Sequence, residues 1–104
     1  MEPLFKSLVR DALQKARAKH GRQLTPHESY AVLLEEVDEF WDLVRSYSGS
    51  DPPHIRLSCL ISMLEELSQI GAMAQRAAED VILPRLEALN CQHDSVKVEF
   101  RARD

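Results

Sequence analysis

The clearest helix signal in the chain is the stretch TPHESYAVLLEEVDEFWDLVRSY, residues 25–47. Thr25 can cap a helix, Pro26 suits its first position, and Glu28 completes a capping box. We predict a helix from residue 26 to about residue 47, ended by the Ser-Gly-Ser of residues 48–50. At about 100° per residue its apolar side chains share one broad face, which comprises Tyr30, Leu33, Val37, Phe40, Trp41 and Val44. We assign the aromatic side chains of this face to the core.

Two more helices are predicted on either side of this one. Residues 4–19 carry apolar side chains at helical spacing, and Gly21 follows where a left-handed residue would end the helix. Another helix should run from Asp51, as its cap, to about Val81, roughly 45 Å at the usual rise. Small residues such as Gly71 would let another helix approach closely. Because this helix is longer than one small chain can cover on one side, we expect a second subunit to pack against it.

Composition narrows the function classes. The 104 residues are 44% apolar and 29% charged, which fits a single domain spanning residues 1–104. A net charge of −4 argues against nucleic acid as the partner, since phosphate binding needs a basic surface. No apolar run reaches the roughly 18 residues of a membrane span. We therefore predict a cytoplasmic protein with no membrane association, in which Cys59 and Cys91 stay reduced.

The helical pattern of apolar residues weakens after Pro84. Leu86 and Leu89 indicate a short helix, so residues 84–104 are interpreted as a short helix followed by an arm or tail. Residues 95–101 alternate apolar and charged side chains, which leaves an edge strand, a partner-bound arm and a disordered end as open alternatives.

An acidic cluster lies in the middle of the second helix. Glu35 and Glu36 are each about one turn from Glu39, so three carboxylates share a patch where like charges repel. Val32 and Leu43 project on the side of Glu36 and Glu39, which counts against a merely solvated acidic face. Carboxylates bordered by apolar side chains suit a partly buried divalent cation, because hard cations take oxygen ligands.

The third helix offers a matching acid, Glu66, which can face Glu36 and Glu39 if the two helices are antiparallel. An EExxE motif followed by a second acidic motif resembles the MazG-like all-α nucleoside triphosphate pyrophosphohydrolases, and the likeness covers about residues 4–81. In that family the second motif is ExxD, whereas this chain has Gln69 in place of the aspartate. An amide oxygen can coordinate Mg²⁺ but brings no charge, which lowers the expected metal affinity.

The resemblance implies an all-α helical bundle completed by oligomerisation into a dimer or tetramer. It also implies hydrolysis of a nucleoside triphosphate between the α- and β-phosphates, giving a monophosphate and pyrophosphate. Mg²⁺, or Mn²⁺ in its place, would assist the attacking water, and Glu35 or Glu36 would be the general base. The residues that would hold the metal are Glu35, Glu36, Glu39, Glu66 and Gln69.

Other interpretations stay open beside this one. Lys15, Lys19 and Arg22 suit the negative end of the first helix, and phosphate contact is their alternative role. Because Gln69 departs from the family pattern, the alternative function is a catalytically silent relative that binds nucleotides or proteins. A third possibility is a helical oligomerisation domain whose acidic face is only solvated.

Overall fold

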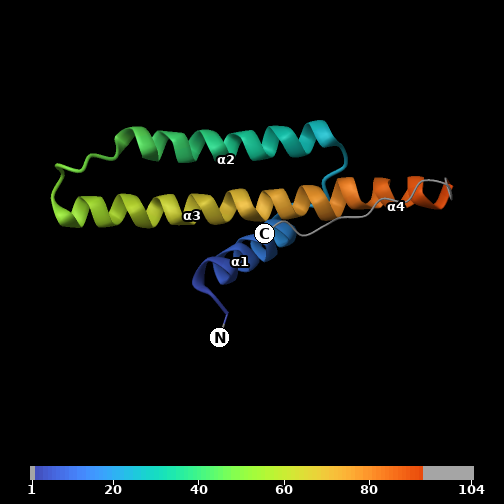
Figure 1. Cartoon of the computed structure of the whole chain (residues 1–104), viewed down its shortest axis with the longest axis horizontal. Helices are drawn as coiled ribbons and strands as arrows, with labels where there is room; N and C mark the ends of the chain where they lie inside the picture. Colours follow the sequence, from blue (N-terminus) through green and yellow to red (C-terminus); the bar gives the residue numbers. More distant parts are fainter. Residues whose placement is uncertain (1, 93–104) are drawn as a thin grey trace.

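The computed structural model describes residues 2–92, which contain helices and no strand (Figure 1). The all-α prediction is confirmed for this part of the chain. None of its helices is both long and apolar enough to cross a membrane. The alternatives for residues 95–101 lie outside the described residues. The elements are α1 (Leu4–Lys19), α2 (Pro26–Ser46), α3 (Pro53–Ala77), a π-helical turn η1 (Ala78–Ile82) and α4 (Leu83–Gln92).

Helix α3 lies in the middle of the molecule. Helix α2 runs antiparallel beside it, and α1 crosses it obliquely on another side (Figure 1). The core is small and lies where α1 meets α3, with half-buried residues of α2 completing it. Its buried members are Ala12, Leu13, Ala72 and Met73, and Val9, Ala16, Val32 and Leu33 pack against them.

The crossing of α1 over α3 depends on a small residue. A Cβ atom added at Gly71 would lie 3.0 Å from Val9 Cγ2, so glycine permits this close approach. The prediction that a helix can approach closely here is therefore confirmed, and the helix that does so is α1 of the same chain.

The Thr25 cap of α2 is confirmed, whereas the hydrogen bond from the Thr25 N–H to the Glu28 carboxylate that would complete a capping box is not found among the described residues, and the apolar face of α2 is not buried as predicted. The Glu28 backbone N–H donates to Thr25 Oγ1 at 3.1 Å. Tyr30 and Trp41, however, are 65% and 56% exposed, so their assignment to the core was wrong. Helix α3 contacts a different side of α2, and one neighbouring helix cannot cover so broad a face.

Two helix ends differ from the sequence prediction. Gly21 has no positive φ; α1 ends instead because His20 adopts an extended conformation, with φ −121° and ψ 147°. Asp51 does not cap α3, which begins at Pro53 after Pro52 with ψ 151°. A residue that precedes proline is kept out of the helical region, so Pro52 cannot join the helix.

The third helix does not end near residue 81 but continues through η1 into α4. Pro84 has no N–H, so the Asp80 carbonyl loses its usual helical donor four residues later. The wider π turn accommodates the proline, and Arg22 replaces the missing donor. Its Nε and Nη2 atoms donate to the Asp80 carbonyl oxygen at 3.1 and 3.0 Å. A contact from a residue far away in the sequence thus permits one helix over residues 53–92.

This account predicts that Arg22 and Pro84 are energetically coupled. Arg22→Met should lower the free energy of unfolding by about 1 kcal/mol, because the Asp80 carbonyl then lacks a donor. In a Pro84→Ala background the restored N–H can serve that carbonyl, so the cost of Arg22→Met should shrink. Urea unfolding of the four proteins in a double-mutant cycle measures this coupling. Equal costs in the two backgrounds would contradict it.

Candidate functional site

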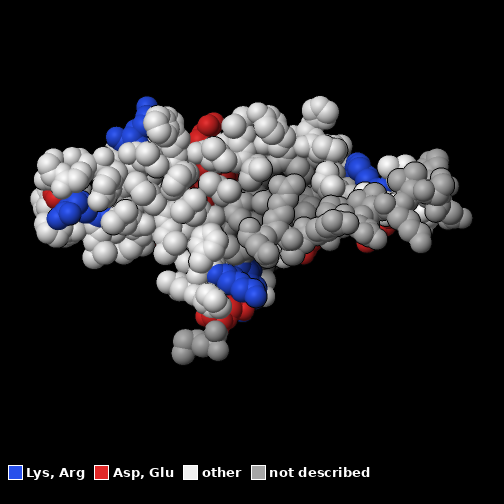
Figure 2. Space-filling view, in the orientation of Figure 1, with Lys and Arg blue, Asp and Glu red and all other residues white. Residues whose placement is uncertain are grey.

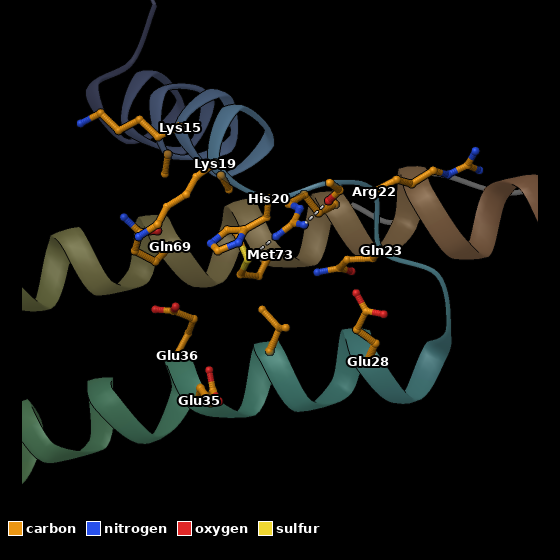
Figure 3. A pocket seen from close by; sticks show the side chains of 15 residues that line it. Lys15, Lys19, His20, Arg22, Gln23, Glu28, Glu35, Glu36, Gln69 and Met73 are labelled. Atoms are coloured by element: carbon orange, nitrogen blue, oxygen red, sulfur yellow. Dashed lines mark hydrogen bonds between the residues drawn. The ribbon is translucent and has the colours of Figure 1, made fainter.

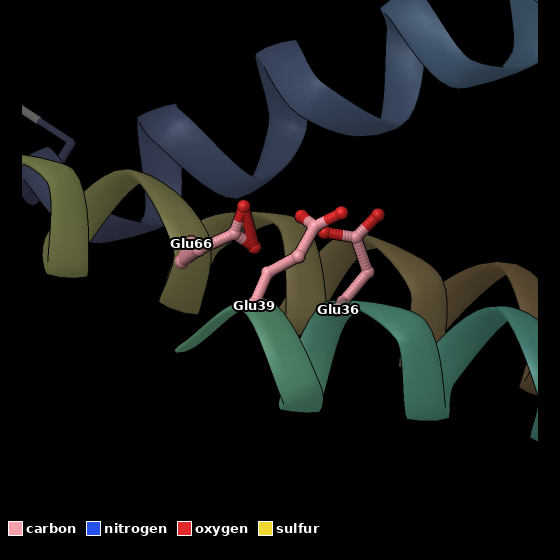
Figure 4. Close-up of side chains that lie close together, drawn as sticks. All are labelled: Glu36, Glu39 and Glu66. Carbon is pink, nitrogen blue, oxygen red and sulfur yellow. The ribbon is translucent and has the colours of Figure 1, made fainter. Parts of the chain in front are cut away.

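Three carboxylates meet between α2 and α3. Glu36 and Glu39 come from α2 and Glu66 from α3, and one oxygen atom of each lies within 4.8 Å of the others (Figure 4). This is the arrangement that the antiparallel pairing of the two helices predicts. Glu66 Oε2 is buried and has no hydrogen-bond partner. Three hard oxygen ligands with one unsatisfied buried oxygen fit a divalent cation such as Mg²⁺.

Crowding and burial change the protonation of these groups. Burial raises the pKa of Glu66 to about 8, and hydrogen bonding to Glu39 and Glu36 together with their charges adds to the effect. Burial also raises the pKa of Glu36, and the charges of Glu39 and Glu35 add to it. The metal-free cluster therefore holds a proton at neutral pH, which a bound cation would displace.

A pocket of about 480 Å³ adjoins this cluster and lies among α1, α2, α3 and the segment that joins α1 to α2 (Figure 3). Helix α2 contributes Glu28, Val32, Glu35 and Glu36 to its wall. Helix α1 contributes Lys15 and Lys19, and α3 contributes Gln69, Met73 and Arg76. Its volume is in the range of small-molecule sites. Because Glu36 belongs to both the pocket and the carboxylate cluster, a ligand in the pocket could reach a metal held by the cluster.

The remaining acidic and amide candidates lie beside the cluster. Glu35 is exposed and lines the pocket, but it is not one of the three clustered carboxylates. Gln69 lines the pocket next to Glu36, and it also lines a second hollow next to Glu39 and Glu66. The structure thus brings together three of the five predicted metal residues and places the other two at the border of the site.

The three predicted phosphate-contacting cations point in different directions. Lys19 extends toward Gln69, whereas Lys15 points away from the pocket (Figure 3). The Arg22 side chain also extends away, toward the Asp80 carbonyl oxygen that it bonds. Lys19 is therefore the predicted cation that the pocket geometry favours for a phosphate.

Two lining residues were missed in the sequence. Gln23 and Arg76 are only 1% and 4% exposed, and both line the pocket. The sequence does mark Arg76, because it is the one charged residue between Glu66 and Glu79 in a run of otherwise uncharged residues. A cation in such a run is typical of a buried, partnered arginine. Gln23 lies in a connecting segment, where no periodicity marks burial.

A buried carboxylate holds this part of the pocket in place. Burial alone would raise the pKa of Asp80, but the hydrogen bonds from Arg17 and from the Gln23 backbone N–H hold it below its usual value. The Arg17 Nη1 and Gln23 N atoms lie 2.7 and 3.1 Å from its carboxylate oxygens. Asp80 therefore has a structural role, outside the carboxylate cluster.

The site combines an oxygen-rich cluster for a hard cation with a pocket of mixed charge. Such a combination can bind an anionic ligand only through the cation and the nearby lysine, because carboxylates alone would repel it. No protein-family model, curated protein or solved structure matches the chain.

The raised pKa of Glu66 predicts a pH-dependent stability. The folded state holds this proton more tightly than the unfolded state, so the contribution of Glu66 to stability is greatest below about pH 5 and is lost as the pH rises through about 8. Glu66→Gln should remove much of this decline and stabilise the metal-free protein at pH 8.5 by about 0.5–1 kcal/mol. Melting in EDTA between pH 5 and 8.5 measures it.

Glu87→Gln, an equal charge change on exposed α4, is the control and should keep the wild-type slope. A Glu66→Gln protein with the same slope as wild type would show that the cluster does not titrate in this range.

Proposed function

We propose that the chain is a Mg²⁺-dependent nucleoside triphosphate pyrophosphohydrolase, similar to the MazG-like enzymes. It would cleave between the α- and β-phosphates and release a nucleoside monophosphate and pyrophosphate. The observation that supports this most directly is the meeting of Glu36, Glu39 and Glu66 beside the pocket that Glu36 also lines. A solvated acidic face would not need to bury an oxygen of Glu66 without a partner.

The metal would be held by Glu36, Glu39 and Glu66, with the Gln69 amide oxygen next to them. When bound, Mg²⁺ or Mn²⁺ supplies positive charge that offsets both the carboxylate repulsion and the charge of the phosphates. The neutral amide of Gln69 leaves this site with one negative charge fewer than the family pattern would give. We therefore expect weak metal binding and slow turnover.

Other side chains of the pocket are candidates for binding the phosphates and for accepting a proton from water. Lys19 reaches toward Gln69 and can bind a phosphate oxygen next to the cluster. Glu35 lines the pocket without belonging to the cluster, so its carboxylate is free to accept a proton from the attacking water. Glu36 is the weaker candidate for the base because its oxygens are needed for the metal.

A second candidate function is nucleotide or protein binding without hydrolysis. The specific observation in its favour is Gln69, which stands where the family pattern has a charged ligand. The two functions differ in one result: a silent relative would bind a nucleotide and leave it intact.

We also propose that the chain assembles with itself into a dimer or tetramer. On the face shown in Figure 2, few charged side chains cover α2 and α3. Exposed apolar patches of this kind mark association surfaces. At about 100° per residue, the exposed apolar side chains of α2 project away from Glu36 and Glu39. The exposed members on α2 are Tyr30, Leu34, Val37, Trp41 and Val44, and α3 adds Leu57, Leu60, Ile61 and Leu67.

The hydrolytic proposal is tested by a panel of ribo- and deoxynucleoside triphosphates. Pyrophosphate and monophosphate should appear only with Mg²⁺ or Mn²⁺, and NaCl at matched ionic strength should not replace the metal. Glu36→Gln should lower the rate about 100-fold or more, because it removes charge from both the metal cluster and the pocket. Glu87→Gln should keep the rate. Orthophosphate as the product, or nucleotide binding without turnover, would contradict the enzyme proposal.

The assembly proposal is tested by light scattering at micromolar concentration. The mass should exceed the 11.9 kDa of one chain at least twofold. Val37→Lys combined with Trp41→Lys should lower the mass toward that of one chain, since it places two charges in the exposed apolar patch. Gln14→Lys combined with Asp11→Lys, on exposed positions of α1, is the control and should not change the mass. A wild-type mass of 11.9 kDa would refute the proposal.

A further inference from the structure

The inner end of the pocket contains hydrogen-bond donors that the chain itself does not satisfy. Gln23 Nε2 and Arg76 Nε are buried side-chain atoms without a hydrogen-bond partner. Both residues line the pocket, and both are more than nine-tenths buried. Burying such donors costs free energy unless something accepts from them. Two unsatisfied donors at one end of a ligand-sized pocket therefore indicate a ligand with acceptor atoms.

The Gln23 side chain is held by a hydrogen bond at the pocket wall. Its Oε1 accepts from Ser29 Oγ at 2.6 Å, and in this orientation the amide nitrogen has no partner. Its backbone N–H donates to Asp80 Oδ2 at 3.1 Å, which fixes the main chain. In Figure 3 the Gln23 nitrogen faces the space between α2 and α3. The donor is thus held in one direction, as a recognition group must be.

The Arg76 guanidinium is fixed in a similar way. Its Nη2 donates to the Gly21 carbonyl oxygen at 2.8 Å and its Nη1 contacts Met73 Sδ at 3.5 Å. Only Nε remains without a partner. Arg76 therefore adds a second fixed donor, and with it positive charge, at the end of the pocket where Gln23 lies.

The distance from these donors to the carboxylate cluster matches the length of a nucleotide. Glu28 and Glu36 both line the pocket and are eight residues apart on α2, which is about 12 Å along the helix. Gln23 lies at the Glu28 end, and the cluster begins at the Glu36 end (Figure 3). A nucleotide with its phosphates near Glu36 would place its base near Gln23, between the apolar side chains of Val32 and Met73.

We propose that Gln23 and Arg76 recognise a nucleobase through a carbonyl oxygen. The site would take nucleotides of uracil, thymine, cytosine or guanine in preference to those of adenine, the one common base without a carbonyl oxygen. Adenine would leave at least one of the two buried donors poorly matched. This inference rests on the proposed function, since it requires that the pocket bind nucleotides.

The test is calorimetric binding of the α,β-methylene analogues of UTP and ATP, which cannot be cleaved between the α- and β-phosphates, in Mg²⁺. Wild type should bind the UTP analogue about tenfold more tightly, the effect of one well-placed buried donor. Gln23→Glu keeps an acceptor for Ser29 but replaces the N–H donors with an acceptor, so the preference should disappear or invert. Gln14→Glu makes the same charge change on exposed α1 and should keep the preference.

A second variant guards against a folding defect in the first. Ser29→Ala leaves Gln23 intact but releases its amide, so it should lower the preference while wild-type melting behaviour shows that the fold persists. If both analogues bind wild type equally, or if Gln23→Glu keeps the preference, the base-recognition proposal fails and the proposed hydrolase stands. If neither analogue binds and no triphosphate is hydrolysed, the proposed function itself fails, and this inference fails with it.

Discussion

The ionised carboxylate of Asp80 holds the pocket side of this molecule together. It lies where α1, the segment that follows α1, and η1 come together, and it accepts hydrogen bonds from Arg17 and from the Gln23 backbone. Burial would by itself raise the pKa of Asp80, but these two partners and the nearby charge of Arg76 keep the pKa below its usual value. Since α1 and the adjoining segment form one wall of the pocket, the geometry around Lys19 and Gln23 depends on this buried charge.

The carboxylate cluster differs from Asp80 in how its charge is balanced. Among the described residues, Glu36, Glu39 and Glu66 form no ion pair, and the ion pairs there involve other acids. The cluster relieves its repulsion by holding a proton, and the raised pKa of Glu66 expresses this. Asp80 is thus satisfied by hydrogen bonds within the chain, whereas the cluster carries a proton at neutral pH.

The features that sequence predicts well here are local ones. The bounds of α1, the Thr25 cap and the convergence of Glu36, Glu39 and Glu66 all follow from helical spacing and from one antiparallel pairing. These depend on residues close in sequence or on adjacent helices joined by a short connection. Helical periodicity is therefore enough to predict the main part of the candidate metal site.

The features that sequence does not predict depend on distant partners. The sequence predicts one helix that ends near Val81 and a separate short helix after Pro84, but a side chain from the segment before α2 supplies the hydrogen bond that the proline removes. The exposure of Trp41 is not predicted, because periodicity identifies an apolar face but not the neighbour that covers it. Gln23 is buried where its segment meets Asp80 of η1 and Ser29 of α2, which no spacing within that segment encodes. In each case tertiary contact overrides the local rule.

The π turn at residues 78–82 has a geometric consequence for the long helix that contains it. A turn with one additional residue advances the backbone by roughly 100° before α-helical winding resumes. The side chains of α4 are therefore out of angular phase with those of α3, although the two helices share one axis. A molecule lying along α3 and another lying along α4 would approach this single rod from different directions, each meeting its own row of side chains.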